Sequence, residues 1–125
     1  MTLYEEIGSV SINEVVTEFY KRAFEDVIIG HFFFEKERLA ITKKQIDFAT
    51  AMLGGPRSYT GQSLEQVHSN LGIRAPHFGR RQVLMAEVLK ESGLTKEHSQ
   101  NWLALEERLR PLIFNERHCF GGDRK

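Results

Sequence analysis

The sequence predicts an all-α protein with one domain. Apolar residues recur at helical spacing in several stretches, and no stretch keeps the alternation of apolar and polar residues that is typical of a strand. Glycine or proline separates these stretches from one another. A chain of 125 residues suits one domain and can bury a core without metal or disulfide cross-links.

The first long helix is expected to begin at a capping box, Ser11 to Glu14, in which two side chains satisfy free backbone N–H groups. Its apolar residues share one face: Ile12, Val15, Val16, Phe19, Tyr20, Ala23 and Phe24. Residues 26–34 then form an exit and a corner. The three consecutive phenylalanines Phe32 to Phe34 cannot all point the same way, so we expect this corner to wrap a large apolar object or a deep core.

A second long helix is predicted over residues 37–53 and ends at Gly54-Gly55-Pro56, because glycine adopts the left-handed cap and proline cannot continue a helix. One face of this helix carries Ile41, Gln45, Phe48 and Met52. A second capping box, Ser63 to Gln66, predicts a short helix that carries His68 and ends at Gly72.

A third long helix is predicted over residues 76–91, followed by a stop at Gly93. Its core face carries Phe78, Met85, Val88 and Leu89. Thr95 is the expected cap of the last helix, whose apolar residues are Trp102, Leu105, Leu109, Leu112 and Ile113. Pro111 lies inside this pattern, where proline costs about 3 kcal/mol, so a bend is expected. The predicted domain covers residues 1–118, and residues 119–125 form a tail that is expected to fray.

Composition excludes several classes of protein. Seventeen basic and seventeen acidic side chains give no net charge, and no basic stripe suits nucleic acid. The single cysteine, Cys119, allows no internal disulfide and fits a reducing compartment. The N-terminus lacks the pattern of a signal peptide, and no apolar stretch is long enough to span a membrane. We therefore expect a cytoplasmic protein that binds neither nucleic acid nor membrane.

Three polar residues stand out against the apolar pattern. Tyr20 and Gln45 lie on apolar helix faces, and His68 is carried by the short helix. A buried polar group without a partner costs roughly 1–3 kcal/mol. One arrangement would employ all three: a haem iron bound by His68 on one side, with Tyr20 and Gln45 facing a ligand on the other. The alternatives are a surface histidine, a core tyrosine bonded to the backbone, and a glutamine turned to solvent.

The chain also resembles a known family, the truncated haemoglobins, and most closely their first group. The resemblance spans residues 3–115. It rests on Tyr4-Glu5-Glu6-Ile7-Gly8, Phe19-Tyr20, Asp26, Phe32-Phe33, Lys44-Gln45, Phe48, Gly54-Gly55-Pro56, Tyr59, Gly61, His68, Ile73 and His77-Phe78. No single dipeptide is specific, but the set at these spacings is.

The resemblance implies a two-over-two helical sandwich around haem b. It assigns the proximal iron ligand to His68 and the two distal polar positions to Tyr20 and Gln45. Ile41 would stand where longer globins place a distal histidine, and Phe33 would pack flat against the haem. Further residues are implied near the haem: Lys44, which reaches a propionate or supplies a sixth ligand in some members, and Phe48, Tyr59, Ile73, Phe78 and Arg81.

Two positions depart from the family pattern. Ser9 stands where a second glycine is usual, and Arg81 stands where the family has an apolar residue facing the haem pocket. An arginine there must extend to solvent, pair with a propionate or a carboxylate, or enter the pocket. His118 lies near the end of the last helix, as does a histidine that bonds covalently to haem in some relatives.

Two other histidines are weaker candidates for the iron ligand. His77 is near His68 in the sequence but falls at a helix start, where family members carry a histidine that does not bind iron. His31 lies at the corner, where we expect it to be solvated.

Three functions follow from these expectations. The protein would bind O2, and other diatomic gases such as NO and CO, and would convert NO to nitrate with a separate reductase. The alternative is O2 storage, scavenging or sensing without turnover, by a monomer or weak dimer. A third hypothesis is a helical domain that keeps the pattern without haem.

Overall fold

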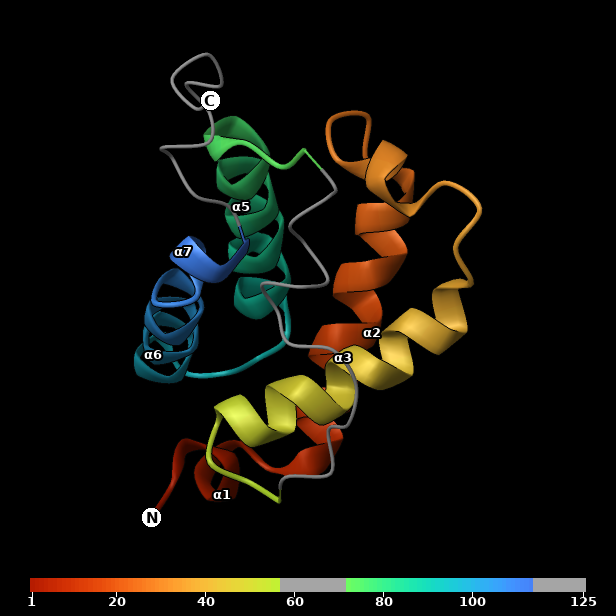
Figure 1. The fold of residues 1–125 in the computed structure, drawn as a ribbon. Helices are drawn as coiled ribbons and strands as arrows, with labels where there is room; N and C mark the ends of the chain where they lie inside the picture. Colours follow the sequence, from red (N-terminus) through yellow and green to blue (C-terminus); the bar gives the residue numbers. More distant parts are fainter. Residues whose placement is uncertain (57–71, 114–125) are drawn as a thin grey trace.

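The computed structural model describes residues 1–56 and 72–113, and over these ranges it contains helices and no strand, as predicted. Two layers of helices are arranged as shown in Figure 1. The elements are α1 (Leu3–Ile7), α2 (Ser9–Glu25), the 3-10 helix η1 (Gly30–Phe33), α3 (Arg38–Met52), α5 (Ala75–Glu91), α6 (Lys96–Glu107) and α7 (Arg110–Ile113). None of the helices in these ranges is long and apolar enough to cross a bilayer.

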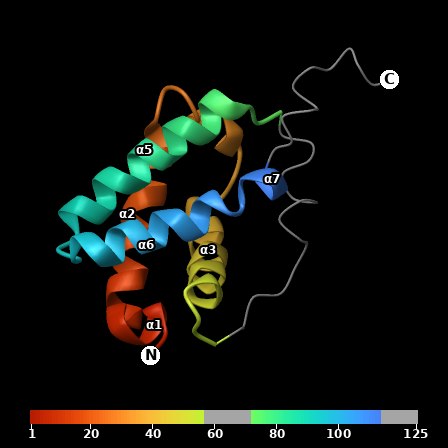
Figure 2. The same ribbon diagram turned by 90° about the vertical axis from the view of Figure 1, so that its left-hand side faces the viewer.

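The helices pack two on two. α5 and α6 run antiparallel, joined by a turn at Gly93, and in Figure 2 they lie side by side in front of α2 and α3. α2 is the central helix, since it packs against α1, η1, α3 and α5. The predicted faces of α2 and α5 form the core, in which the largest fully buried side chains are Trp102, Phe19, Phe78, Ile12, Met85, Leu89 and Val15.

The predicted start of the first long helix was wrong. The capping box is formed by Thr2 and Glu5 at the start of α1, where each side chain accepts a hydrogen bond from the other residue's backbone N–H. α2 begins at Ser9, so Ser11 lies inside its first turn. Gly8 separates the two helices with a φ of 90°, which favours glycine, and no side-chain cap is needed there.

The other predicted helix ends are confirmed within one residue. α3 is followed by Gly54 with a φ of 99°, and α5 ends before Gly93. Thr95 Oγ1 accepts a hydrogen bond of 3.0 Å from the His98 N–H and caps α6. The expected bend near Pro111 is present as the break between α6 and α7. The predicted short helix with His68 and the C-terminal tail lie outside the described residues.

The corner after α2 is built around Asp26. Its carboxylate accepts hydrogen bonds from the backbone of Ile28 and Ile29 and a bifurcated pair from the Arg80 guanidinium on α5. Phe33 stacks on Phe24 with ring centroids 4.6 Å apart. This corner thereby places an aromatic ring beside the α2 residues that face the interior.

Candidate ligand pocket

A pocket opens between the two helical layers. Its cavity volume, measured with a water-sized sphere, is about 60 Å³. α2, α3, α5, α6 and α7 all contribute to its wall, together with Leu109 in the break before α7. The lining residues are Val16, Tyr20, Gln45, Phe48, Ala49, Met52, Phe78, Arg81, Met85, Trp102, Glu106, Leu109 and Ile113.

α3 turns its predicted inner face to this pocket. Gln45, Phe48 and Met52 recur at helical spacing, and all three are half-buried. The buried residues of α3 are only Thr42 and Ala49 among those described. Part of the inner face of α3 therefore lines the pocket.

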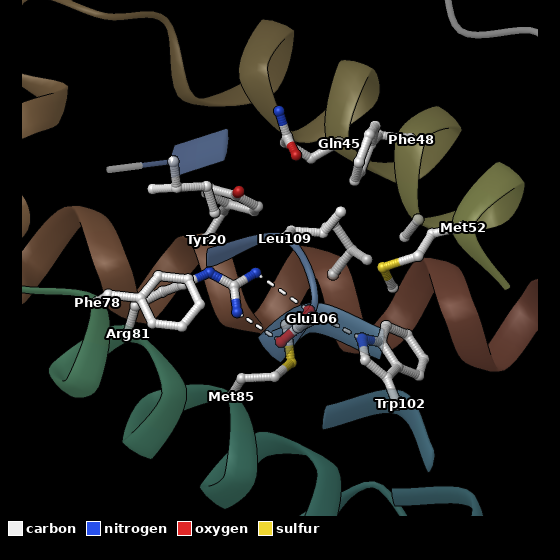
Figure 3. A pocket seen from close by; sticks show the side chains of 13 residues that line it. Tyr20, Gln45, Phe48, Met52, Phe78, Arg81, Met85, Trp102, Glu106 and Leu109 are labelled. Atoms are coloured by element: carbon white, nitrogen blue, oxygen red, sulfur yellow. Dashed lines mark hydrogen bonds and ion pairs between the residues drawn. The ribbon is translucent and has the colours of Figure 1, made fainter. Parts of the chain in front are cut away.

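Tyr20 reaches the pocket from α2, opposite α3. Its ring is held edge-on by Phe19 and Phe33, with centroids 4.8 and 6.0 Å away. Burial raises the pKa of Tyr20, and the negative charge of Glu106 also raises it, while the positive charge of Arg81 acts in the opposite direction. The phenol therefore stays protonated at neutral pH and keeps an O–H to donate. Figure 3 shows Tyr20 and Gln45 facing one space from two helices.

Arg81 also faces the pocket, and its partner is a carboxylate. Arg81 Nη1 lies 2.5 Å from Glu106 Oε1, and Nη2 lies 3.1 Å from Oε2. Glu106 in turn accepts a hydrogen bond of 2.9 Å from the indole N–H of Trp102. Of the three outcomes open for this arginine, the structure combines two, since it both pairs with a carboxylate and lines the pocket (Figure 3).

Sequence reasoning missed Glu106 as a pocket residue and treated Trp102 only as core. A signal was present. Glu106 lies one turn after Trp102 and about one turn before Leu109, so a carboxylate stands on the apolar face of α6. A carboxylate and an arginine on two apolar faces of one small protein predict a buried ion pair, because a buried charge needs a partner.

The remaining candidate residues divide into three groups. Phe48 and Phe78 line the pocket. Phe33 is outside the lining set and contacts the Tyr20 ring edge-on. Ile41 and Ile73 are half-buried but outside the lining set, and Lys44 is exposed on α3. Tyr59, His68 and His118 lie outside the described residues.

His77 is engaged locally. Its Nδ1 accepts a hydrogen bond of 2.9 Å from the Arg74 N–H at the start of α5. Its ring meets Phe32 edge-on at 4.9 Å and lies 5.7 Å from the ring of His31. Burial, followed by the charges of His31 and Arg74, lowers the pKa of His77, so this imidazole favours its neutral form.

The pocket fits one side of a flat apolar cofactor. Aromatic and aliphatic side chains form most of its wall, and its polar side chains include the Tyr20 hydroxyl, the Gln45 amide and the Arg81–Glu106 ion pair. Such a site, apolar with a few convergent polar groups, is typical of cofactor and small-ligand pockets. The donor set also suits a small polar ligand beside the cofactor, because Tyr20 and Gln45 can both donate hydrogen bonds.

Comparisons with known proteins agree with this description. Residues 2–115 match the family model of the bacterial-like globins. A group 1 truncated hemoglobin from Tetrahymena pyriformis is 35% identical over 95 residues, which cover 75% of this chain and 78% of the relative. A group 1 truncated hemoglobin, GlbN, from Mycolicibacterium paratuberculosis is 37% identical over 97 residues, covering 77% and 71% of the two chains.

Solved structures share the fold. The Fe(III) form of truncated hemoglobin from Tetrahymena pyriformis superposes with a TM-score of 0.86 at 30% identity, over 91% of this chain and 98% of that one. The 2/2 hemoglobin from Synechococcus, with covalently attached heme, gives a TM-score of 0.84 at 22% identity, over 92% and 99% of the chains. The predicted two-over-two fold is therefore confirmed.

Proposed function

The chain belongs to the bacterial-like globin family as a group 1 truncated haemoglobin, a haem protein that binds diatomic gas, and we propose that its pocket takes O2 with Tyr20 and Gln45 as the hydrogen-bonding partners of the ligand. The observation that carries this proposal is that a hydroxyl from α2 and an amide from α3 line one pocket, whose other lining side chains are apolar except for Trp102 and the Arg81–Glu106 ion pair.

Each residue has a defined part in this proposal. Haem b, when bound, would supply an iron that can bind both a protein nitrogen and a gas. His68 would be the protein nitrogen. Tyr20 would donate its O–H to the ligand, which contributes about 0.5–1.5 kcal/mol, and more when the acceptor carries charge. Gln45 would donate to the ligand or accept from Tyr20.

The relatives add support for these positions. Variants of the Tetrahymena pyriformis protein change one tyrosine and two glutamines. The spacing of these three residues in that chain equals the spacing of Tyr20, Ile41 and Gln45 here. We infer from this spacing that the tyrosine and the second glutamine correspond to Tyr20 and Gln45, and that Ile41 stands in the place of the first glutamine.

We further propose that the O2-loaded protein oxidises NO to nitrate. A ligand held by a hydrogen bond leaves slowly, and slow release favours reaction with NO over delivery of O2. Each turnover then needs one electron from a separate reductase. The alternative is storage, scavenging or sensing of O2 without turnover, which the same two polar residues would serve.

Stopped-flow mixing with NO tests the proposal. The purified haem-loaded protein is reduced, its absorption spectrum is recorded before and after O2, and the O2-loaded form is mixed with NO. We expect a stable O2 complex and one nitrate per haem, repeated when a reductase is supplied. Tyr20→Phe is the matched control and should release O2 about tenfold faster. A nitrate yield no higher than that of free haem contradicts the NO chemistry and leaves the alternative.

A further inference from the structure

The pocket contains a buried charge pair that the proposed function does not use. Arg81 on α5 and Glu106 on α6 meet inside the pocket wall. The Glu106 side chain is 7% exposed and that of Arg81 is 23% exposed. Because Arg81 lines the pocket, its accessible surface faces the space in which the ligand is expected.

Glu106 is held firmly. Its Oε2 accepts from both Trp102 and Arg81, and its Oε1 accepts from Arg81. Trp102 is fully buried in the core, so the carboxylate has a fixed anchor. A bidentate contact between a guanidinium and a carboxylate also fixes the plane of the arginine.

Further contacts restrict Arg81. Its Cζ atom lies over the Phe19 ring, 4.7 Å from the centroid. Its Nη1 also donates to the Gln82 side-chain oxygen at 2.6 Å, and Gln82 in turn donates to Glu107. The Phe19 ring thus covers one face of the guanidinium, and the Glu106 carboxylate binds one of its edges. The remaining N–H groups of Arg81 point away from Glu106.

Tyr20 lies on that remaining side. It neighbours Phe19 in α2, and Figure 3 shows the guanidinium between Glu106 and Tyr20. Burial raises the pKa of Tyr20, and the positive charge of Arg81 opposes this rise. A guanidinium is a permanent cation whose polar groups are all donors. It therefore attracts the Tyr20 oxygen and repels the hydroxyl proton, so this proton must point to an acceptor on another side.

We propose that Arg81, anchored by Glu106 and Trp102, is a positioning residue for Tyr20: its positive charge attracts the phenol oxygen and turns the Tyr20 O–H toward the ligand side of the pocket. The pair thereby favours ligands that accept a hydrogen bond, such as polarised O2, over weak acceptors such as CO. This inference rests on the proposed function, because it assumes a gas ligand beside Tyr20.

Infrared spectroscopy of the carbon monoxide complex tests the orientation directly. A donor that points at the ligand lowers the C–O stretching frequency, and a single donor orientation gives a single band. We expect one narrow, low-frequency band from the haem-loaded protein. The double variant Arg81→Met/Glu106→Gln should give several bands or a band at higher frequency, and about tenfold faster O2 release, which is the loss of one hydrogen bond.

The double variant is chosen so that the fold survives. Arg81→Met alone leaves Glu106 buried without its cation, which is costly, whereas replacing both members of a buried pair is often tolerated. The introduced glutamine side chain keeps an oxygen that can accept from Trp102. Circular dichroism and urea unfolding check that the variant is folded.

A thermodynamic cycle with Tyr20→Phe separates positioning from direct contact. If Arg81 acts through Tyr20, the Arg81→Met/Glu106→Gln change moves neither the C–O band nor the O2 release rate in the Tyr20→Phe background. Additive effects mean that Arg81 acts on the ligand itself, and they overturn the inference. An unchanged C–O band in the double variant with Tyr20 intact also overturns it. A protein that takes up no haem and forms no CO complex instead refutes the proposed function, and this inference with it.

Discussion

Asp26 ties the corner after α2 to the middle of α5. Its side chain is 5% exposed. The hydrogen bond from Arg80 lowers the pKa of Asp26 below its ordinary value of 3.8, and the backbone N–H groups of Ile28 and Ile29 add to this effect against the opposing effect of burial. The folded protein thus binds a proton at Asp26 less readily than the unfolded chain does, so this contribution to stability exists at neutral pH and is lost as the pH falls through the lowered value.

We expect Asp26→Asn to lower the melting temperature by a few degrees at pH 7. Below pH 3.8 the difference from the parent protein should shrink, because the unfolded parent chain then binds a proton at Asp26 more readily than the folded one does, which favours unfolding. Thermal unfolding followed by circular dichroism between pH 3 and pH 7 measures both effects. Glu25→Gln, an exposed neighbour, is the control and should leave the curve unchanged. A difference that stays constant over this range would mean that the carboxylate charge contributes nothing.

At the same scale, sequence reasoning could locate polar residues but not pair them. Tyr20 and Gln45 attract attention because each interrupts an apolar helix face, and Arg81 because it departs from the family pattern. All three line the pocket. Periodicity gives the face of a helix but not the helix that it meets. The contact between Arg81 and Glu106 depends on the packing of α5 on α6, so it became visible only in three dimensions.

At the scale of elements, the junction of α1 with the end of α3 depends on a close approach. The Tyr4 N–H donates to the Leu53 carbonyl at 2.8 Å. A Cβ added at Gly55 would lie 2.6 Å from the Tyr4 ring and 2.9 Å from Thr50 Cγ2. Gly79, inside α5, is the opposite case, since a Cβ there meets no described atom within 4 Å.

Substitution by alanine should therefore have opposite signs at the two glycines. Gly55→Ala must displace the Tyr4 ring and should cost about 1–3 kcal/mol. Gly79→Ala restricts the unfolded chain, suits a helix interior and should stabilise the protein by about 0.5–1 kcal/mol. Urea unfolding of the haem-loaded variants gives both values. Equal effects at the two sites would mean that α1 does not pack tightly against the end of α3.

The elements also indicate why one helix start was predicted wrongly. Two capping-box patterns, Thr2 to Glu5 and Ser11 to Glu14, lie near the start of the chain, and local sequence does not rank them. The first is used because Tyr4 finds a backbone partner in Leu53, far away in the sequence, and because Gly8 provides the turn. Gly54, Gly93 and Thr95 were predictable because their caps are made within a few residues.

At the scale of the whole molecule, the core is unevenly distributed. The buried residues belong mainly to α2 and α5, with Trp102 of α6, whereas α3 contributes few. Residues such as Phe48, Met52, Leu109 and Ile113 are half-buried and face the pocket. A bound haem would cover these side chains, so it would complete a second apolar core on the α3 side of α2.

Removal of haem should therefore destabilise α3 more than it destabilises α2 and α5, in addition to lowering the stability of the whole fold. A ligand that binds only the folded state stabilises it by about 4 kcal/mol at a thousand times its dissociation constant, so the apoprotein should melt many degrees lower. The backbone amides of α3 should lose their protection from hydrogen exchange first, because the inner face of α3 loses its cover. The amides of α2 and α5 stay protected by their own buried residues.

Calorimetry and hydrogen exchange on the haem-free and haem-loaded proteins measure the two effects. Leu84→Ala in the buried core is the contrasting variant, since it should lower the stability of both forms alike. Uniform loss of protection across α2, α3 and α5 would instead mean that the two cores fold as one unit and that α3 has no separate dependence on the cofactor.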